Sequence, residues 1–99
     1  MIHILWEYSV RQERRAEFEE AYGGSGAWVR FFRQDPAYRG TILARDPEDP
    51  DRYLTVDAWD SRRTYEEFAR RHAEEYRAID ARCEAFTREE KRLGLFEAV

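Results

Sequence analysis

The sequence has only one cysteine and no long apolar stretch, so it lacks the marks of disulfide-bonded and membrane-spanning proteins. Its single cysteine, Cys83, excludes an internal disulfide and favours a reducing compartment. It also lacks a long apolar stretch: the N-terminal run Ile2 to Trp6 is interrupted by His3 and is too short for a signal-peptide core or a membrane span. We therefore expect a cytoplasmic protein that does not enter a membrane.

Basic residues are not gathered into any block. The 17 basic and 21 acidic residues are scattered along the chain and give a net charge of −4, so nucleic acid is not an expected partner. Two histidines far apart, His3 and His72, with one cysteine give no metal-ligand spacing. Neither a Rossmann fingerprint nor a Gly-Xaa-Ser-Xaa-Gly elbow occurs. No metal and no cofactor is predicted.

Aromatic residues, in contrast, are abundant. The chain of 99 residues fits one domain, residues 1–99, and it holds six tyrosines, six phenylalanines and three tryptophans. A hydrophobic share of 42% with 38% charged residues is typical of a folded protein. So many rings exceed what a small core needs, which indicates that some of them line a cavity or an interface.

Hydrophobic periodicity predicts the order β-α-(short α)-β-β-α-β. The predicted strands are residues 2–8, 41–45, 52–59 and 92–98, and the predicted helices are residues 11–22, 27–34 and a helical stripe from Tyr65 to Phe86. That stripe is either one long helix or two helices with a bend. The order predicts a ferredoxin-like α+β sandwich with a four-stranded antiparallel sheet.

Capping residues mark where two of these helices begin. Ser9 with Gln12 has the spacing of a capping box for the first helix. Ser61 is the expected cap of the later helix, with Thr64, whose box partner would be Glu67, as the alternative. These positions set the expected helix starts.

The strand "YLTVDAWDS" (Tyr53 to Ser61) has two unlike faces, because side chains alternate along a strand. One face is apolar and is expected in the core: Leu54, Val56 and Ala58. The other mixes rings with polar groups: Tyr53, Thr55, Asp57 and Trp59. We expect this second face to meet either a cavity under the helices or the sheet of a partner chain.

The sheet also has a face that the helices leave bare. Aromatic residues on both faces of the first and third strands indicate that this bare face is covered, most simply by a second copy of the chain. A homodimer is therefore predicted.

The stretch "YRGTILARDPEDPDRYLTVDAWDS", Tyr38 to Ser61, resembles the middle of the antibiotic biosynthesis monooxygenase family. The similar features are the Gly-Thr start of the second strand, the Arg-Tyr-Leu-Thr return of the hairpin, and the Trp-Asp-Ser that leads into a helix bearing Tyr and Phe. The order of elements from Ile2 to Phe96 agrees. The resemblance implies a dimeric α/β barrel, a fold that hosts many functions.

Two kinds of chemistry are implied by that resemblance. One branch of the family oxidises aromatic polyketides with oxygen and no cofactor. The other degrades haem with a strand-one Asn and a helical Trp and His. Here Glu7 replaces that Asn, Phe68 stands near the Trp position, and His72 comes too early, so haem degradation is disfavoured.

For the cofactor-free branch, Trp59 and Tyr65 match an aromatic pair around the cavity. Thr55 and, roughly, Ile79 stand where that pattern has Asn and Arg.

His72 is the predicted general base, because a histidine titrates near neutral pH without special tuning. A core histidine bonded to Asp57 or a tyrosine is the alternative reading. The predicted catalytic residues are His72, Tyr65 and Trp59. The predicted substrate-binding residues are Trp28, Tyr53, Asp57, Phe68 and Tyr76.

Three other residues have expected roles of a simpler kind. Asp57 is expected either to orient His72 or, preferably, to pair with an arginine across the dimer. His3 is expected at an interface or a sheet edge, and Cys83 as a small buried apolar residue.

The predicted function is a cofactor-independent monooxygenase acting on a small aromatic substrate of the polyketide or quinol type. A non-catalytic homodimer that binds a small hydrophobic ligand is the alternative.

Overall fold

The chain folds into four strands and four α-helices. The strands are β1 (Ile2–Val10), β2 (Tyr38–Arg45), β3 (Arg52–Trp59) and β4 (Thr87–Glu97). The helices are α1 (Arg15–Tyr22), α2 (Ala27–Phe32), α3 (Arg62–Arg71) and α4 (Ala73–Cys83), with short 3-10 turns at Gln12–Arg14 and Glu84–Phe86. The computed structural model describes all residues from 1 to 99. None of the helices has the length and apolar character needed to cross a membrane.

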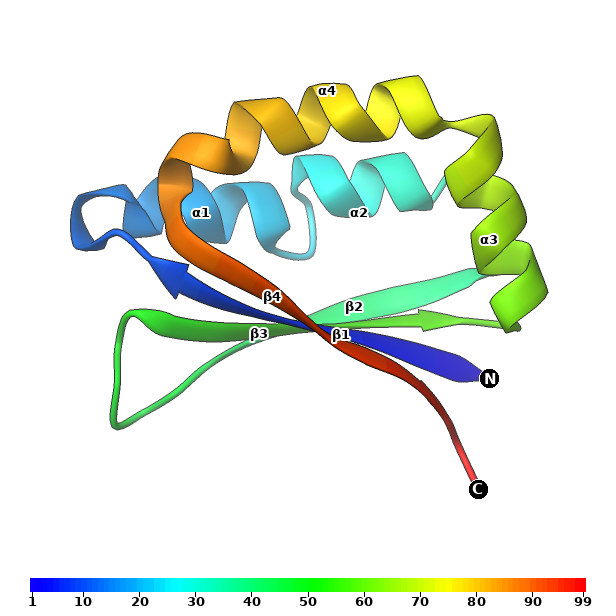
Figure 1. The fold of residues 1–99 in the computed structure, drawn as a ribbon, viewed down its shortest axis with the longest axis horizontal. Helices are drawn as coiled ribbons and strands as arrows, with labels where there is room; N and C mark the ends of the chain where they lie inside the picture. The colour runs from blue at the N-terminus through cyan, green and yellow to red at the C-terminus, as the bar shows by residue number, and fades with distance from the viewer.

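All four strands form one antiparallel sheet in the order β2-β3-β1-β4. The helices all lie against one face of this sheet, and the other face has no helix over it (Figure 1). This is the ferredoxin-like α+β sandwich that the order of elements predicts. β1 lies in the middle of the sheet because it pairs with both β3 and β4.

Alternation along β1 decides which of its side chains enter the core. Ile2, Ile4, Tyr8 and Val10 are buried under the helices. Trp6 shares this face, and the side chains of His3, Leu5, Glu7 and Ser9 point to the opposite face of the sheet. The central strand is therefore apolar on both faces in its first half, although only one face is covered by this chain.

Aromatic rings fill the space between the helices and the sheet. Trp59, at the end of β3, is fully buried and meets the rings of Phe32 and Phe68 with centroids 5.8 and 5.2 Å apart. Phe18 of α1 stacks on Tyr22 at 4.2 Å. Pairs of this kind each add about 0.5–1.5 kcal/mol beyond the burial of their area. Much of the surplus of rings in the sequence therefore serves the core.

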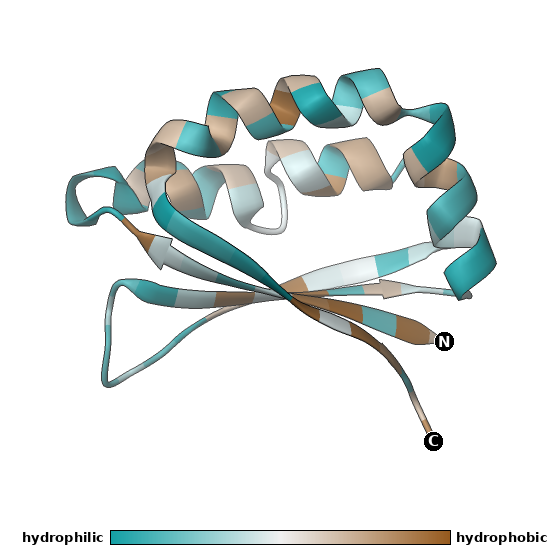
Figure 2. Cartoon of the chain, viewed as in Figure 1, coloured by the Kyte–Doolittle hydropathy of each residue, from teal (hydrophilic) through white to brown (hydrophobic).

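The bare face of the sheet, which we call the open face, carries apolar side chains in its central part. Its members are His3, Leu5, Ile42, Ala44, Leu54, Val56, Ala58 and Phe96. Ile42 is 65% exposed and Phe96 53% exposed. β4 turns from hydrophilic to hydrophobic along its length toward this patch (Figure 2). The expectation that Leu54, Val56 and Ala58 belong to the core is wrong, because the helices cover the other face of β3.

The long helical stripe is two helices that meet at His72 and run in different directions (Figure 1). His72 ends α3 and precedes α4, with φ −113° and ψ 29°, outside the helical region. Ser61 begins α3 in a capping box, since its side chain accepts from the Thr64 N–H and the Thr64 hydroxyl accepts from the Ser61 N–H. The prediction of Ser61 as the cap, and of a bend as one alternative, is confirmed.

Several predicted boundaries are wrong: α1 begins at Arg15, α2 ends at Phe32 and β2 begins at Tyr38, and the end of β1 and the start of β4 also differ. Ser9 still belongs to β1, and the first helical turn after it has Arg11 at its cap with no side-chain hydrogen bond, so Ser9 and Gln12 form no capping box. β4 begins at Thr87, five residues before the predicted Arg92. This first half of β4 is a charged edge strand that has no apolar alternation to reveal it.

Candidate functional site

A small cavity lies between the helices and the sheet, and we call it the aromatic cavity. Twelve residues line it: Trp6, Tyr8, Tyr22, Trp28, Phe32, Thr41, Thr55, Asp57, Tyr65, Tyr76, Asp80 and Glu90. Its volume is about 40 Å³. A water molecule needs roughly 10–15 Å³ measured in this way, so the cavity has room for about three.

β3 supplies the polar part of the cavity wall. Its alternation turns Thr55 and Asp57 toward the helices, with Tyr53 and Trp59 on the same face. Of the two expectations for this mixed face, the cavity is thus the correct one for this chain. The hydroxyls of Thr55 and Tyr8 are 3.0 Å apart and share a hydrogen bond in which either can be the donor. This bond holds both polar groups in the wall.

Asp57 is the strongest acid–base candidate in the cavity. Burial raises the pKa of its carboxyl from 3.8 to about 6, while a hydrogen bond from Thr41 acts in the opposite direction. The Thr41 hydroxyl donates to Asp57 Oδ1 at 2.5 Å, and the hydroxyls of Thr41 and Tyr38 are also 2.5 Å apart. These contacts tether one carboxylate oxygen to β2 and leave Oδ2 for the cavity.

The tyrosine hydroxyls of the cavity stay protonated at neutral pH. Burial is the main cause that raises the pKa of Tyr8, Tyr65 and Tyr76 above the usual value of 10. A phenol that stays neutral can donate a hydrogen bond to a developing anion. The cavity thus joins one base that titrates near neutral pH to several neutral donors.

Two more carboxylates stand where the cavity meets solvent, between α4 and β4. Asp80 of α4 and Glu90 of β4 line the cavity and are exposed. Partial burial raises the pKa of both carboxyls, and each also has an acidic neighbour that raises it further: Glu84 for both, and Asp80 for Glu90. This opening of the cavity, which we call the mouth, is therefore acidic.

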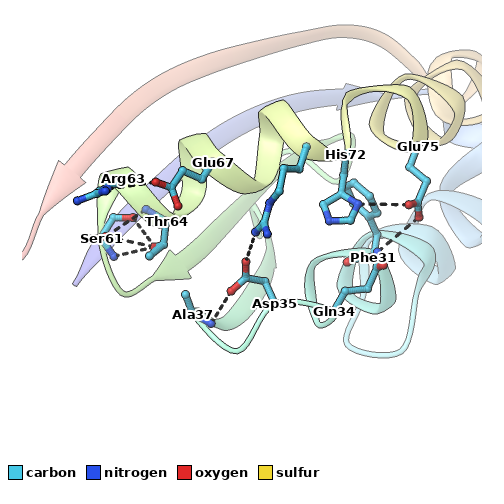
Figure 3. Close-up of polar contacts among 11 residues, drawn as sticks. Phe31, Gln34, Asp35, Ala37, Ser61, Arg63, Thr64, Glu67, His72 and Glu75 are labelled. Carbon is cyan, nitrogen blue, oxygen red and sulfur yellow. Dashed lines mark hydrogen bonds and ion pairs between the residues drawn. The ribbon is translucent and has the colours of Figure 1, made fainter.

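His72 lies outside the aromatic cavity. Its ring packs on Phe68 at 4.4 Å and against Phe31 at 6.0 Å, measured between ring centroids. Its Nδ1 is 3.4 Å from Glu75 Oε1 (Figure 3). Gln34 Nε2 is 3.4 Å from the other Glu75 oxygen. The expected contact of His72 with Asp57 is wrong, because the break between α3 and α4 turns the ring toward Phe31 of α2. Its predicted catalytic role has no geometric support.

The other predicted site residues divide into two groups. Four of them line the cavity: Trp28, Asp57, Tyr65 and Tyr76. Tyr53, Trp59 and Phe68 do not line it; they are core residues beside it. Tyr53 donates a hydrogen bond to Glu19 of α1. Asp57 bonds to Thr41 and does not contact His72, whereas its pairing with an arginine across a dimer stays a prediction.

Besides Thr55, which was expected only on the mixed face of β3, sequence reasoning missed seven lining residues: Trp6, Tyr8, Tyr22, Phe32, Thr41, Asp80 and Glu90. Trp6 and Tyr8 share the core face of β1, so alternation along that strand was a usable signal. The sequence has no such signal for Asp80 and Glu90, because both lie in charged stretches that resemble ordinary solvent-exposed surface.

Cys83 and His3 take simple positions. Cys83 is buried at 4% exposure, and burial raises the pKa of its thiol, so it packs as a small apolar side chain. His3 lies on the open face opposite Ala58 and Phe96. No group of three or more His, Cys, Asp or Glu side chains is placed to hold a metal ion.

Comparison with solved structures shows the same fold in several proteins. A protein of Bordetella bronchiseptica that is named after the same family, antibiotic biosynthesis monooxygenase, is 20% identical and aligns over 99% of this chain and 96% of its own, with a TM-score of 0.79. A mutant form of SnoaB, a cofactor-independent oxygenase from Streptomyces nogalater, is 18% identical over 98% of this chain and 91% of its own, with a TM-score of 0.76.

A conserved protein from Methanosarcina mazei Go1 is 11% identical over 99% of this chain and 92% of its own, with a TM-score of 0.74. At such identities these likenesses establish the fold alone. No curated protein matches the sequence.

The family assignment rests on the sequence itself. The family model described as "Antibiotic biosynthesis monooxygenase" matches residues 1–82, which include all of the elements that form the cavity except β4 and the last residue of α4. The chain therefore belongs to the antibiotic biosynthesis monooxygenase family.

Proposed function

We propose that the protein is a cofactor-independent monooxygenase that oxidises a small aromatic substrate of the anthrone or quinol type in the aromatic cavity. The observation that carries the proposal is Asp57, a half-buried carboxylate in the wall of the aromatic cavity whose pKa is raised to about 6. Membership in the family and the fold shared with SnoaB, which is described as a cofactor-independent oxygenase, support the same chemistry.

Asp57, rather than His72, is the proposed general base. A base is most effective when its pKa lies near the working pH, and burial brings Asp57 to that range. The hydrogen bond from Thr41 fixes the carboxylate, so Oδ2 can take a proton from a substrate held against the rings. His72 has its ring between α2 and α3 and does not reach that position.

The resulting substrate carbanion or phenolate is the reductant, and molecular oxygen is the oxidant. One electron passes from the anion to oxygen, and the radical pair then forms a C–O bond to give a peroxide that recovers the proton from Asp57. Loss of water from this hydroperoxide converts a CH₂ group into a carbonyl, so that one oxygen atom enters the product and the other leaves as water. The protein supplies the base, the position and a site with little water.

Neutral hydroxyls in the cavity can stabilise the negative charge that appears during this sequence. Tyr65 and Tyr76 line the cavity from α3 and α4, and burial raises the pKa of both. Trp59, fully buried, meets the Tyr65 ring at 5.6 Å. We assign Tyr65 a role in binding and Trp59 the role of holding Tyr65 in place.

A homodimer through the open face is part of the proposal. The central rows of this face pair apolar residues across strands, with Val56 between Leu5 and Ile42. At one end of the face, Arg52 of β3 bonds to Glu7 at 2.6 Å. An exposed apolar patch with a charged rim is typical of a protein–protein interface, and a second copy is the partner that a self-complementary patch accepts.

One observation favours the alternative function of a non-catalytic binder. The cavity volume of about 40 Å³ is far below the roughly 300–1,000 Å³ typical of small-molecule sites, so a substrate ring has to displace lining side chains. A cavity that stays closed would hold only a small group. This alternative predicts ligand binding without any uptake of oxygen.

An oxygen electrode tests the proposal with anthrone-type and quinol substrates. Wild type should consume oxygen above the spontaneous rate. The enzymatic rate of Asp57→Asn should be lower by about 10²- to 10⁴-fold, which is the usual contribution of a general base. His72→Ala is the control and should keep the wild-type rate. Equal rates in wild type and Asp57→Asn would remove Asp57 from the mechanism. Binding with no oxygen uptake would favour the non-catalytic alternative.

A further inference from the structure

The aromatic cavity has charge of only one sign. Three of its twelve lining residues are carboxylates, Asp57, Asp80 and Glu90, and none is lysine, arginine or histidine. The chain as a whole has 17 basic residues. A cavity of this composition disfavours an anionic ligand, because it offers no partner for the negative charge and opposes it with carboxylates.

The two carboxylates of the mouth are not neutralised by the protein. The charged groups that act on Asp80 and Glu90 are acids, Glu84 for both and Asp80 for Glu90. Elsewhere in the molecule carboxylates meet arginines closely, as Asp51 meets Arg15 at 2.5 Å. The mouth therefore keeps a negative potential that attracts a cation.

Aromatic rings complete this environment. The other lining residues, apart from the two threonines, are seven aromatic side chains: Trp6, Tyr8, Tyr22, Trp28, Phe32, Tyr65 and Tyr76. The negative faces of such rings attract cations, and the attraction grows when the cation is desolvated. The carboxylates do not form a metal-ion site, so a larger organic cation fits the arrangement better than a metal ion does.

A buried hydrogen-bond donor in the same cavity also lacks a partner. Trp28 is 7% exposed and lines the cavity, and its Nε1 has no acceptor within the chain. The Tyr22 hydroxyl and the Cys83 thiol lie beside it, but neither accepts in good geometry. An unpaired buried N–H costs about 1–3 kcal/mol. The Nε1 atom is itself enclosed, so a ligand oxygen reaches it only when lining side chains move, as they have to for any ring to enter the cavity.

We propose that the aromatic cavity selects an amine-bearing phenol, with the ammonium group between Asp80 and Glu90 at the mouth and the phenolic end inside, where its oxygen accepts from Trp28 Nε1. This inference rests on the proposed function for turnover, since it names the class of substrate for the same site. A positive group on the substrate also explains why the mouth carries two carboxylates and no arginine.

Three phenols with short para side chains of different charge test this inference by binding alone, measured by calorimetry without oxygen. Tyramine is the cation, 4-ethylphenol the neutral analogue and 4-hydroxyphenylacetate the anion. Wild type should bind tyramine about 10-fold more tightly than 4-ethylphenol and bind the anion most weakly. The tyramine advantage should also shrink at high salt, because charges at an exposed mouth are screened.

A double variant, Asp80→Asn with Glu90→Gln, should lose most of the tyramine advantage and keep its affinity for 4-ethylphenol. Glu89→Gln is the matched control, because Glu89 precedes Glu90 on β4, pairs with Ser9, and lines a different pocket on the other face of the sheet. It should behave as wild type.

Equal binding of tyramine and 4-ethylphenol, a tyramine advantage that survives in the double variant, or no binding of any of the three would overturn the inference. Oxygen uptake with neutral substrates alone would overturn it too and leave the proposed function standing. Tyramine selectivity with no oxygen uptake from any substrate would refute the proposed function and leave the binding preference intact.

Discussion

Ionisation of Asp57 at neutral pH lowers the stability of the folded protein. Burial raises the pKa of this carboxyl from 3.8 to about 6, so the folded protein holds the proton more tightly than the unfolded chain does. The stability linked to that proton is present in full below about pH 4 and is lost as pH rises through about 6. At about 1.4 kcal/mol for each pKa unit, the loss is about 3 kcal/mol.

Asp57→Asn should therefore raise the free energy of unfolding at pH 7 by about 1–3 kcal/mol relative to wild type, because the amide never ionises and can still accept from Thr41. The gain should shrink toward zero as pH falls from 6 to 4. Urea unfolding at a series of pH values measures the difference.

Asp60→Asn is the matched control for this experiment. Arg39 bonds to Asp60 and lowers the pKa of its carboxyl, so the fold favours the ionised form there and the amide should bring no gain at pH 7. A stability difference between Asp57→Asn and wild type that is the same from pH 4 to pH 7 would contradict the assignment of a buried, titrating Asp57.

Single residues also show how much of the site the sequence could predict. Asp57, Trp28, Tyr65 and Tyr76 were predicted and do line the cavity, because alternation along a strand and spacing along a helix report a shared face. His72 was the leading candidate and lies outside it. Its place in the periodic stripe is real, but periodicity holds only while a helix continues, and the helix ends at His72.

At the scale of elements, the sequence predicts most of the architecture. β3 has the predicted bounds, Arg52–Trp59, because β-branched and aromatic residues alternate between two clear turn signals. The capping box at Ser61 is a local signal and also agrees with the structure. Fold elements that rest on short-range patterns were thus the predictable ones.

The elements that sequence reasoning misplaced depend on pairing across the sheet. β1 extends to Val10 because it pairs with β4, so Ser9 is a strand residue and no helix cap. The first half of β4 pairs with β1 through backbone hydrogen bonds, although its side chains are charged. Pairing partners distant in sequence decide such boundaries, and no local pattern reports them.

For the whole molecule, the open face of the sheet sets the expected oligomeric state. Ile42→Asp places a charge on this face at a residue that is 65% exposed in the single chain, so the fold should tolerate it. In the proposed homodimer the same charge would be buried, so the dissociation constant of the dimer should rise ~30-fold or more. Sedimentation across a concentration series measures this change.

Ala16→Asp, an equal change in charge on the exposed side of α1, should leave the dimer intact. Wild-type protein that sediments as a monomer at micromolar concentration would contradict the homodimer. So would a dimer whose dissociation constant is the same in wild type and Ile42→Asp.

The aromatic cavity and its acidic mouth are properties of the assembled domain, since their lining residues come from all four strands and from α1, α2, α3 and α4 together. In the proposed mechanism Asp57 has to be ionised, because only the carboxylate can accept a proton from the substrate. The pH dependence of turnover therefore tests the base directly.

The decisive measurement is kcat/KM for oxygen uptake between pH 5 and pH 8 with an anthrone-type or quinol substrate, corrected for spontaneous oxidation. Wild type should gain activity as pH rises and level off above the Asp57 pKa of about 6, because kcat/KM reports groups of the free enzyme. Asp57→Asn should show no such rise. A wild-type profile that stays flat through pH 6, or an Asp57→Asn profile that matches it, would contradict Asp57 as the base of the aromatic cavity.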